Sequence, residues 1–292
     1  MYVLNLVLRA LFDALLFPFR GMPAIVGVLV VSLLTAIGML IVFKATSNQD
    51  AIAGVKRKIH AGLFEIRLFN DDFRAILRAQ RDILRHNLSY LRHSLVPMIF
   101  LLPPMVLAIA QLQFHYGYEG LEPGQATILE VELAAGWETS GAVPTSPASG
   151  KPLLELELPA GVAQETPPVW VPEERLLAWR LRAETAENHE IAILAGDERY
   201  AKTIPGAGTI IERRSPVRPD RSILDQLIYP AEPALPGDSV VAAIRIELPP
   251  GDLPIGGWRL EELAGIPAWM LAYFVLSIVF AFALRKPMGV EI

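Results

Sequence analysis

Three uncharged, apolar runs constrain the fold of this 292-residue chain more than any other feature. They extend over residues 24–43, 94–114 and 266–284. Each is long enough to cross the roughly 30 Å of bilayer hydrocarbon as a helix. A hydrophobic content of 52% and a mean hydropathy of +0.38 are both high for a soluble chain. We therefore predict three transmembrane helices.

The distribution of charge predicts how these helices are oriented. Residues 44–93 carry ten Lys and Arg against five acidic residues, whereas residues 115–265 carry twelve against twenty-four. Because positive charge collects on the cytoplasmic side, we expect the basic segment and the C-terminal tail in the cytoplasm. The acidic region and the N-terminus are then extracytoplasmic, and the expected location is the bacterial inner (cytoplasmic) membrane. The chain has no cysteines, so disulfides do not bear on this assignment.

The first 21 residues are apolar but carry Arg9, Asp13 and Arg20. This pattern predicts an interfacial amphipathic helix with Arg9 and Asp13 paired one turn apart. A cleaved signal peptide is the alternative, and it is disfavoured because no small-residue cleavage site follows a short apolar core.

The basic segment between the first two runs predicts a cytoplasmic helical hairpin over residues 47–92. Ser47 or Asn48 can cap the first helix, and apolar residues then recur at spacings of three and four. The second helix, up to about Arg92, has an apolar stripe of Phe73, Leu77, Leu84, Leu88 and Leu91. Two such helices joined by a short turn are expected to fold back antiparallel.

Five arginines share one face of the second hairpin helix, namely Arg74, Arg78, Arg81, Arg85 and Arg92. They fit a solvated face with internal ion pairs. They also fit a contact with anionic lipid headgroups or with the phosphates of ribosomal RNA. The sequence does not separate these readings.

The second apolar run differs from the others in its prolines. Pro97, Pro103 and Pro104 each lack a backbone N–H and crowd the preceding turn. We therefore expect a kinked or locally open helix whose freed carbonyls are satisfied by neighbouring groups.

The region 115–262 changes to a period of two. Alternating segments at 127–133, 154–158, 176–182, 190–194, 199–203 and 240–248 are separated by Pro and Gly turn signals. This pattern predicts a β-sandwich domain, with long loops at 139–149 and 206–219. Residues 263–292 then supply the third transmembrane helix and a short tail, and Trp258 and Trp269 are predicted to anchor its entry at the membrane interface.

The sequence contains no recognisable catalytic pattern. The five histidines lie in different segments without close pairing to Cys, Asp or Glu, and no nucleophile elbow or phosphate loop is present. We predict a protein that is not an enzyme and that needs no cofactor or metal.

The order of these elements resembles the three-helix core of the YidC-type insertase superfamily, most of all its short archaeal members and the insertase subunit of the endoplasmic reticulum membrane complex. The resemblance covers residues 22–114 and 264–286. It is carried by Ser47-Asn48-Gln49-Asp50, Lys56-Arg57-Lys58, the helix through Gln80 to Asn87, and the segment Pro97 to Pro104. The chain departs from the family in having no arginine within a span and in carrying the β-domain between spans two and three.

The resemblance implies a polar groove, open to the cytoplasm, that eases the entry of hydrophilic client segments into the bilayer. The candidates for its lining are Ser32, Thr35, Gln111, Gln113 and Ser277. We expect an insertase-like or chaperone-like protein. Its expected partners are membrane lipids, client membrane proteins and the ribosome, but not DNA. Two alternatives stay open, namely a structural accessory subunit of a larger membrane complex and an extracytoplasmic ligand sensor.

Overall fold

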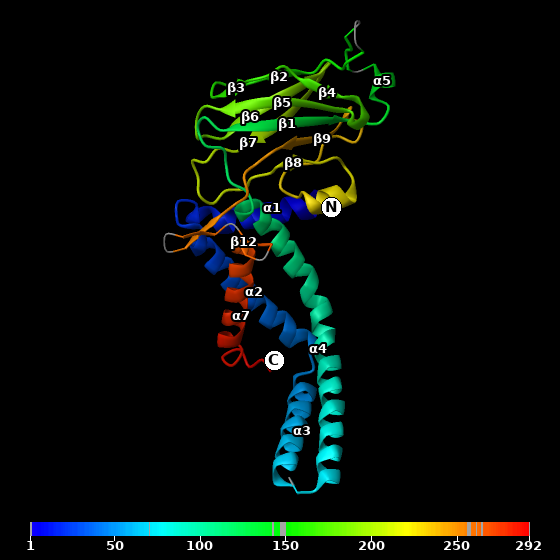
Figure 1. The fold of residues 1–292 in the computed structure, drawn as a ribbon, viewed down its shortest axis with the longest axis vertical. Coiled ribbons are helices and arrows are strands. Elements are labelled where there is room, and N and C mark those ends of the chain that lie inside the picture. The colour runs from blue at the N-terminus through cyan, green and yellow to red at the C-terminus, as the bar shows by residue number, and fades with distance from the viewer. Residues whose placement is uncertain are drawn as a thin grey trace. The chain divides into compact units, whose positions relative to one another are not determined.

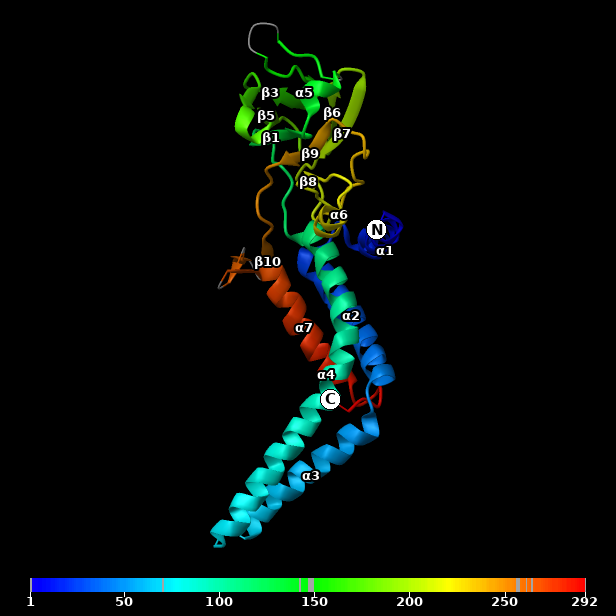
Figure 2. The same cartoon turned by 90° about the vertical axis from the view of Figure 1, so that its right-hand side faces the viewer.

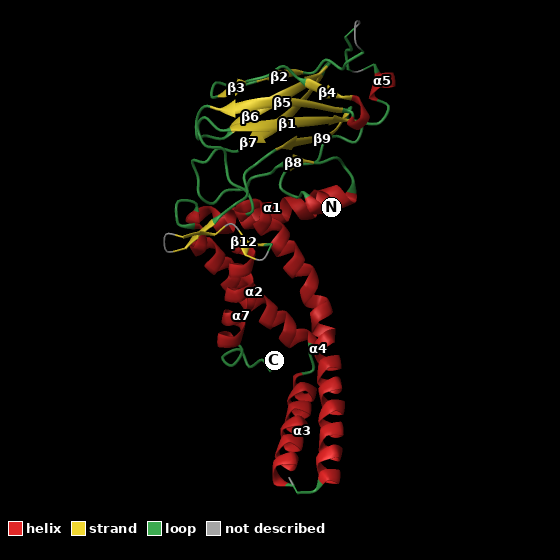
Figure 3. Ribbon diagram, in the orientation of Figure 1, coloured by secondary structure: helices red, strands yellow, loops and turns green. Residues whose placement is uncertain are grey.

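The computed structural model describes residues 2–69, 71–141, 143–146, 150–255, 258–260, 262–263 and 265–291. The chain forms two compact units (Figure 1). The first contains Met1–Gly27 and Ile109–Met270, and the second contains Val28–Ala108 and Leu271–Ile292. The predicted combination of helices with antiparallel sheets is confirmed, as Figure 3 shows.

Two of the predicted spans are helices long and apolar enough to cross a membrane. They are α2 (Ala24–Thr46) and α4 (Phe73–Tyr116). The third is α7 (Ala268–Leu284), an apolar helix of 17 residues and about 25 Å. It is shorter than the predicted run because residues 266 and 267 form a strand instead.

Helices α2 and α7 run parallel within the second unit. The Ser32 hydroxyl donates to the Tyr273 carbonyl at 3.3 Å. Further along, the Lys44 ammonium donates to the Met288 carbonyl at 2.7 Å, beyond the end of α7. The ends of the two helices therefore lie close together within the second unit.

The hairpin consists of α3 (Gln49–Leu68) and the first half of α4, and small residues lie where the two helices meet. Asn48 caps α3 by accepting a hydrogen bond from the amide of Ala51. Gly62 and Ala79 are buried, and a Cβ on Gly62 would lie 2.7 Å from Ile83. The two helices therefore pack closely at Gly62, where α3 has no side chain.

The predicted apolar stripe of α4 does not supply this interface. Its five residues lie on the outer face of the hairpin and are between 49% and 72% exposed. They are Phe73, Leu77, Leu84, Leu88 and Leu91. The outer face of α3 is similarly apolar, with Phe64 and Leu68 exposed.

Helix α4 joins the second hairpin helix and the second apolar run without a break. It continues through Pro97, Pro103 and Pro104, so the helix expected up to about Arg92 extends without a break to Tyr116. The prolines remove amides that would bond the carbonyls four residues earlier. The axis of α4 changes direction between its hairpin part and its apolar part (Figures 1 and 2).

The strands of the first unit form two main antiparallel sheets within the described residues. In the larger sheet the order is β3-β5-β1-β9-β8, with β4 also paired to β5, and in the smaller sheet it is β2-β6-β7. The strands of the larger sheet are β1 (Ala126–Leu133), β3 (Val162–Gln164), β4 (Val169–Val171), β5 (Leu176–Ala183), β8 (Val217–Arg218) and β9 (Val241–Ile246). Those of the smaller sheet are β2 (Glu155–Glu157), β6 (His189–Ala195) and β7 (Glu198–Ile204).

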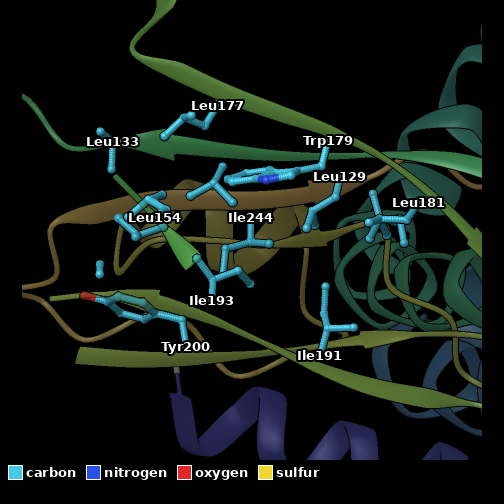
Figure 4. Packing of buried hydrophobic residues seen from close by; sticks show 14 of the residues in the cluster. Leu129, Leu133, Leu154, Leu177, Trp179, Leu181, Ile191, Ile193, Tyr200 and Ile244 are labelled. Atoms are coloured by element: carbon cyan, nitrogen blue, oxygen red, sulfur yellow. The ribbon is translucent and has the colours of Figure 1, made fainter. Parts of the chain in front are cut away.

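Both sheets contribute to one hydrophobic core. Central strand β1 alternates buried and half-buried residues, as predicted, and its Leu129 lies opposite Trp179 on β5. Figure 4 shows Trp179 and Ile244 from the larger sheet above Ile193 and Tyr200 from the smaller one. The period of two in the sequence is therefore the period of burial in the sheet.

Several short elements complete the first unit. They are α1 (Tyr2–Leu16), η1 (Phe17–Phe19), α5 (Trp137–Ser140), η2 (Pro172–Glu174), α6 (Ile223–Ile228), β10 (Leu253–Ile255), β11 (Trp258–Leu260), β12 (Glu262–Leu263) and β13 (Ile266–Pro267). The predicted loop 139–149 begins in α5, and the predicted loop 206–219 contains β8.

We expect Gly62→Leu to destabilise the hairpin by about 1–3 kcal/mol, because the new side chain must displace Ile83 from a close-packed interface. Hydrogen exchange of the α3 amides in the full-length protein measures the effect. Gly54→Leu is the matched control, because a Cβ at Gly54 meets nothing within 4 Å. Equal exchange in the two variants would contradict the close packing.

Candidate functional site

A groove of about 720 Å³ lies where the hairpin joins the apolar part of α4. We call it the hairpin groove. Leucine and valine side chains form its apolar lining, and two of the predicted arginines border it. It is lined by Thr46, Asn48, Arg85, Leu88, Ser89, Leu91, Arg92, His93, Leu95 and Val96. This surface can accept a segment that has both apolar and anionic groups.

All five predicted arginines of the basic face are exposed. Within the described part of the chain none of them forms an ion pair, so the internal pairs with Asp71, Asp72 and Asp82 are not made. Asp72 instead accepts hydrogen bonds from the amides of Arg74 and Ala75 at the start of α4. The arginine face and the exposed apolar stripe therefore lie side by side on the outside of the hairpin.

Three of the predicted groove residues lie where α2 and α7 meet. Ser32 is fully buried and bonds the Tyr273 carbonyl, and the Tyr273 hydroxyl donates to Thr35 at 3.4 Å. One turn further along α7, the Ser277 hydroxyl is buried and has no hydrogen-bond partner among the described residues. The contact between these helices therefore contains a short polar strip inside an otherwise apolar interface.

The other two predicted groove residues, Gln111 and Gln113, belong to the first unit. Gln111 is buried, and its side-chain oxygen accepts a hydrogen bond from Arg213 at 3.1 Å. Gln113 is half-buried, with its amide beside Gly117. Gln111 thus belongs to a partly buried charge cluster rather than to the polar strip.

The guanidinium group of Arg213 is the centre of this charge cluster. It donates to Asp13 at 2.8 and 3.0 Å, to the Arg9 carbonyl at 3.0 Å and to Gln111. Asp13 therefore pairs with Arg213, while the Arg9 side chain donates to the Asn5 carbonyl. The predicted pairing of Asp13 with Arg9 is replaced by a pairing with a residue two hundred positions away.

His115 completes the cluster. Its Nδ1 lies 2.9 Å from the Gln111 carbonyl and its Nε2 lies 3.1 Å from Asp13, so both ring nitrogens face oxygen acceptors. Burial raises the pKa of the Asp13 carboxyl, but the hydrogen bonds from His115 and Arg213 outweigh it and hold the pKa below its ordinary value. The expectation that no histidine pairs with an acidic residue is wrong at His115.

A cavity of about 710 Å³ lies beside this cluster, between the end of α4 and the loops of the first unit. Two basic and three acidic side chains line it together with apolar groups. The ionisable lining residues are His115, Arg214, Glu119, Glu122 and Asp252. Arg214 is buried and donates to the Tyr118 carbonyl at 3.0 Å and to the Thr209 carbonyl.

One predicted membrane anchor is buried inside the protein. Trp269 is 1% exposed and stacks against Tyr116 with ring centroids 6.4 Å apart. It packs inside the first unit, so its ring is not available as an anchor. Trp258 belongs to β11, but its side chain lies outside the described residues.

The sequence did not reveal the partners of Asp13 or the hairpin groove. Arg213 sits in a segment without periodicity, and no local pattern links it to residue 13. The groove depends on which face of α4 turns outward. The small residues Gly62 and Ala79 are the sequence feature that indicates which faces of α3 and α4 meet. A stripe of small residues facing each other across a hairpin allows closer packing than leucines do.

Comparisons with protein-family models, with curated proteins and with solved structures find no match to this chain. Within the described residues there is also no group of three or more His, Cys, Asp or Glu that could hold a metal ion.

We expect Arg213→Lys to loosen α1, because a lysine ammonium cannot reproduce the forked contacts to Asp13, Gln111 and Arg9. Hydrogen bonds to charged groups contribute about 1.5–3 kcal/mol each, so amides of α1 should exchange faster by tenfold or more, measured by hydrogen exchange. Arg199→Lys, at an exposed ion pair with Glu157, is the control. Unchanged exchange in α1 would show that Arg213 does not hold it.

Proposed function

We propose that this protein is an insertase or chaperone for other membrane proteins, acting without catalysis. In this proposal α2, α4 and α7 span the membrane and the hairpin lies in the cytoplasm. The hairpin groove receives an apolar segment of a client protein before the segment enters the bilayer. The observation that carries the proposal is the exposed apolar stripe of α4, which borders unpaired arginines and leads into the apolar half of the same helix.

The exposure of these leucines is what favours a transient client. Soluble hairpins bury such residues, and a contiguous exposed apolar surface marks an interaction site. Arginines beside it attract acidic residues that flank client segments, and they also attract anionic headgroups. A surface of this kind can hold many different apolar segments by shape-tolerant contacts.

The polar strip between α2 and α7 supports the membrane step of the same proposal. Hydroxyl groups inside a bilayer offer hydrogen bonds that hydrocarbon lacks, and each unsatisfied polar group there costs several kcal/mol. The unpaired Ser277 hydroxyl is available for a passing polar group once the helices separate. We propose that parting of α2 and α7 opens this strip to a client.

We expect reversal of charge at the groove, Arg85→Glu with Arg92→Glu, to reduce insertion of a test membrane protein by fivefold or more, since each basic residue near the membrane surface contributes about 1 kcal/mol. Insertion is measured as protease protection of a client translated in the presence of liposomes containing the purified protein. The same reversal at Arg74 and Arg78, which lie on the same face outside the groove, is the matched control.

A photoreactive residue gives the second readout of this prediction. Placed at Leu88 in the groove, it should crosslink to the nascent client, whereas at Leu84 on the same stripe it should do so less. Normal insertion by the Arg85 and Arg92 variant, together with no crosslink from Leu88, would refute the proposed function.

The cavity of the first unit favours a second candidate function, an extracytoplasmic ligand sensor. Its volume suits a small molecule, and its lining of basic, acidic and apolar groups suits a zwitterionic ligand such as an amino acid. The cavity borders the end of α4, so a bound ligand would contact that helix directly. The accessory-subunit alternative has no comparable observation in its favour.

We expect a ligand of this cavity to stabilise the protein by about 2.7 kcal/mol at one hundred times its dissociation constant. Thermal unfolding against a panel of amino acids and other zwitterions measures it. Ala207→Trp, which fills the rim without touching the Arg214 hydrogen bonds, should abolish the shift. Stabilisation that persists in Ala207→Trp would place the ligand elsewhere, and no shift with any compound would remove the sensor function.

A further inference from the structure

Helices α1 and α6 of the first unit share an arrangement that is unusual for a protein surface, since each turns its polar residues inward and leaves several large apolar residues exposed. On α1, Asn5 is buried and Asp13 bonds Arg213, on the side of the helix that also buries Phe12 and Leu16. Val3, Val7 and Leu11, on the other side, are 56–69% exposed. In soluble proteins the apolar stripe of a surface helix faces the core instead.

Helix α6 repeats the pattern on a smaller scale. Ile223, Leu224 and Ile228 are 57–69% exposed. Asp225 and Tyr229 lie on the opposite side, where they line a small cleft with residues of β8 and β9. The polar side of α6 therefore faces the sheet, and the apolar side faces away from it.

The two helices are held beside each other. The side chain of Asn5 donates to the carbonyl of Gln226 at 2.7 Å, and this buried amide joins the N-terminal part of α1 to the middle of α6. Figures 1 and 2 both show α6 next to the N-terminal end of α1. The two outward apolar sides therefore belong to one surface, the α1–α6 surface, made of Val3, Val7, Leu11, Ile223, Leu224 and Ile228.

We propose that the outer leaflet of the membrane covers the α1–α6 surface, so that the apolar side of α6 is immersed in the bilayer. This inference rests on the proposed membrane location of α2. Only the short segment from Phe17 to Pro23 separates α1 from α2, which fixes α1 at the membrane surface if α2 spans it. The Asn5 contact then brings α6 to the same depth.

The residues that flank α6 fit a lipid surface better than a protein partner. Arg221 is exposed just before the helix, where a guanidinium group can reach lipid phosphates. Helices of this composition lie with their apolar side about 5–10 Å deep at the boundary of headgroups and acyl chains. In this proposal α1 and α6 both contact lipid.

Single cysteines make the test direct, because the chain has none of its own. A bimane label is placed at Leu224→Cys in the full-length protein, reconstituted in phosphatidylcholine and phosphatidylglycerol vesicles. A nitroxide at carbon 5 of the acyl chain should quench this label severalfold more than a label at Asp197→Cys, which is exposed in the turn between β6 and β7. Aqueous iodide should show the reverse order.

A label at Leu34→Cys, exposed on α2, separates the two ways in which the inference can fail. Lipid quenching at Leu34 but not at Leu224 would overturn immersion of α6 while leaving α2 in the membrane. No lipid quenching at either position would overturn both this inference and the membrane location on which it rests. A Leu224 label shielded from iodide but not quenched by lipid would mean that a protein covers the surface, which also contradicts it.

Discussion

The four hydrogen bonds of the Arg213 guanidinium group are the interaction on which the first unit depends most. They connect a loop of the β-sheet region to α1 and to the end of α4. The side of α1 that makes this contact also buries Phe12 and Leu16, and Val3, Val7 and Leu11 on the other side remain exposed. The forked geometry of arginine suits this task, since one group satisfies a carboxylate, an amide and a backbone carbonyl together.

The same exchange of faces recurs in the hairpin of the second unit. Its helices approach through Gly62 and Ala79, and the apolar stripe of α4 remains outside. A hairpin built on small residues gives up burial of its leucines and presents them beside arginines. In both units, then, apolar groups are displayed where a soluble protein would hide them, which suits a protein that works on or in a membrane.

The positions of the helices and strands could be predicted from the sequence better than which face of each one is buried. Alternation along 127–133 and 176–182 located the central strands β1 and β5, because one side of each strand lies in the core. The stripe through Leu84 and Leu88 was identified, but which stripe of α4 faces α3 depends on the fit of Gly62 against Ile83, a tertiary property. The partners of Asp13 and Gln111 could not be predicted for a related reason, because Arg213 is close to them only in the folded chain. Burial of Trp269 likewise follows from its contact with Tyr116.

The central claim is that the hairpin and the apolar helices serve client membrane proteins. The most direct measurement is purification of the protein from native membranes in a mild detergent, followed by mass spectrometry of what remains bound. We expect ribosomal proteins and a broad set of unrelated membrane proteins in the bound fraction, each at less than one copy per copy of this protein. A single partner complex bound in fixed stoichiometry would contradict it and would make the protein a structural subunit.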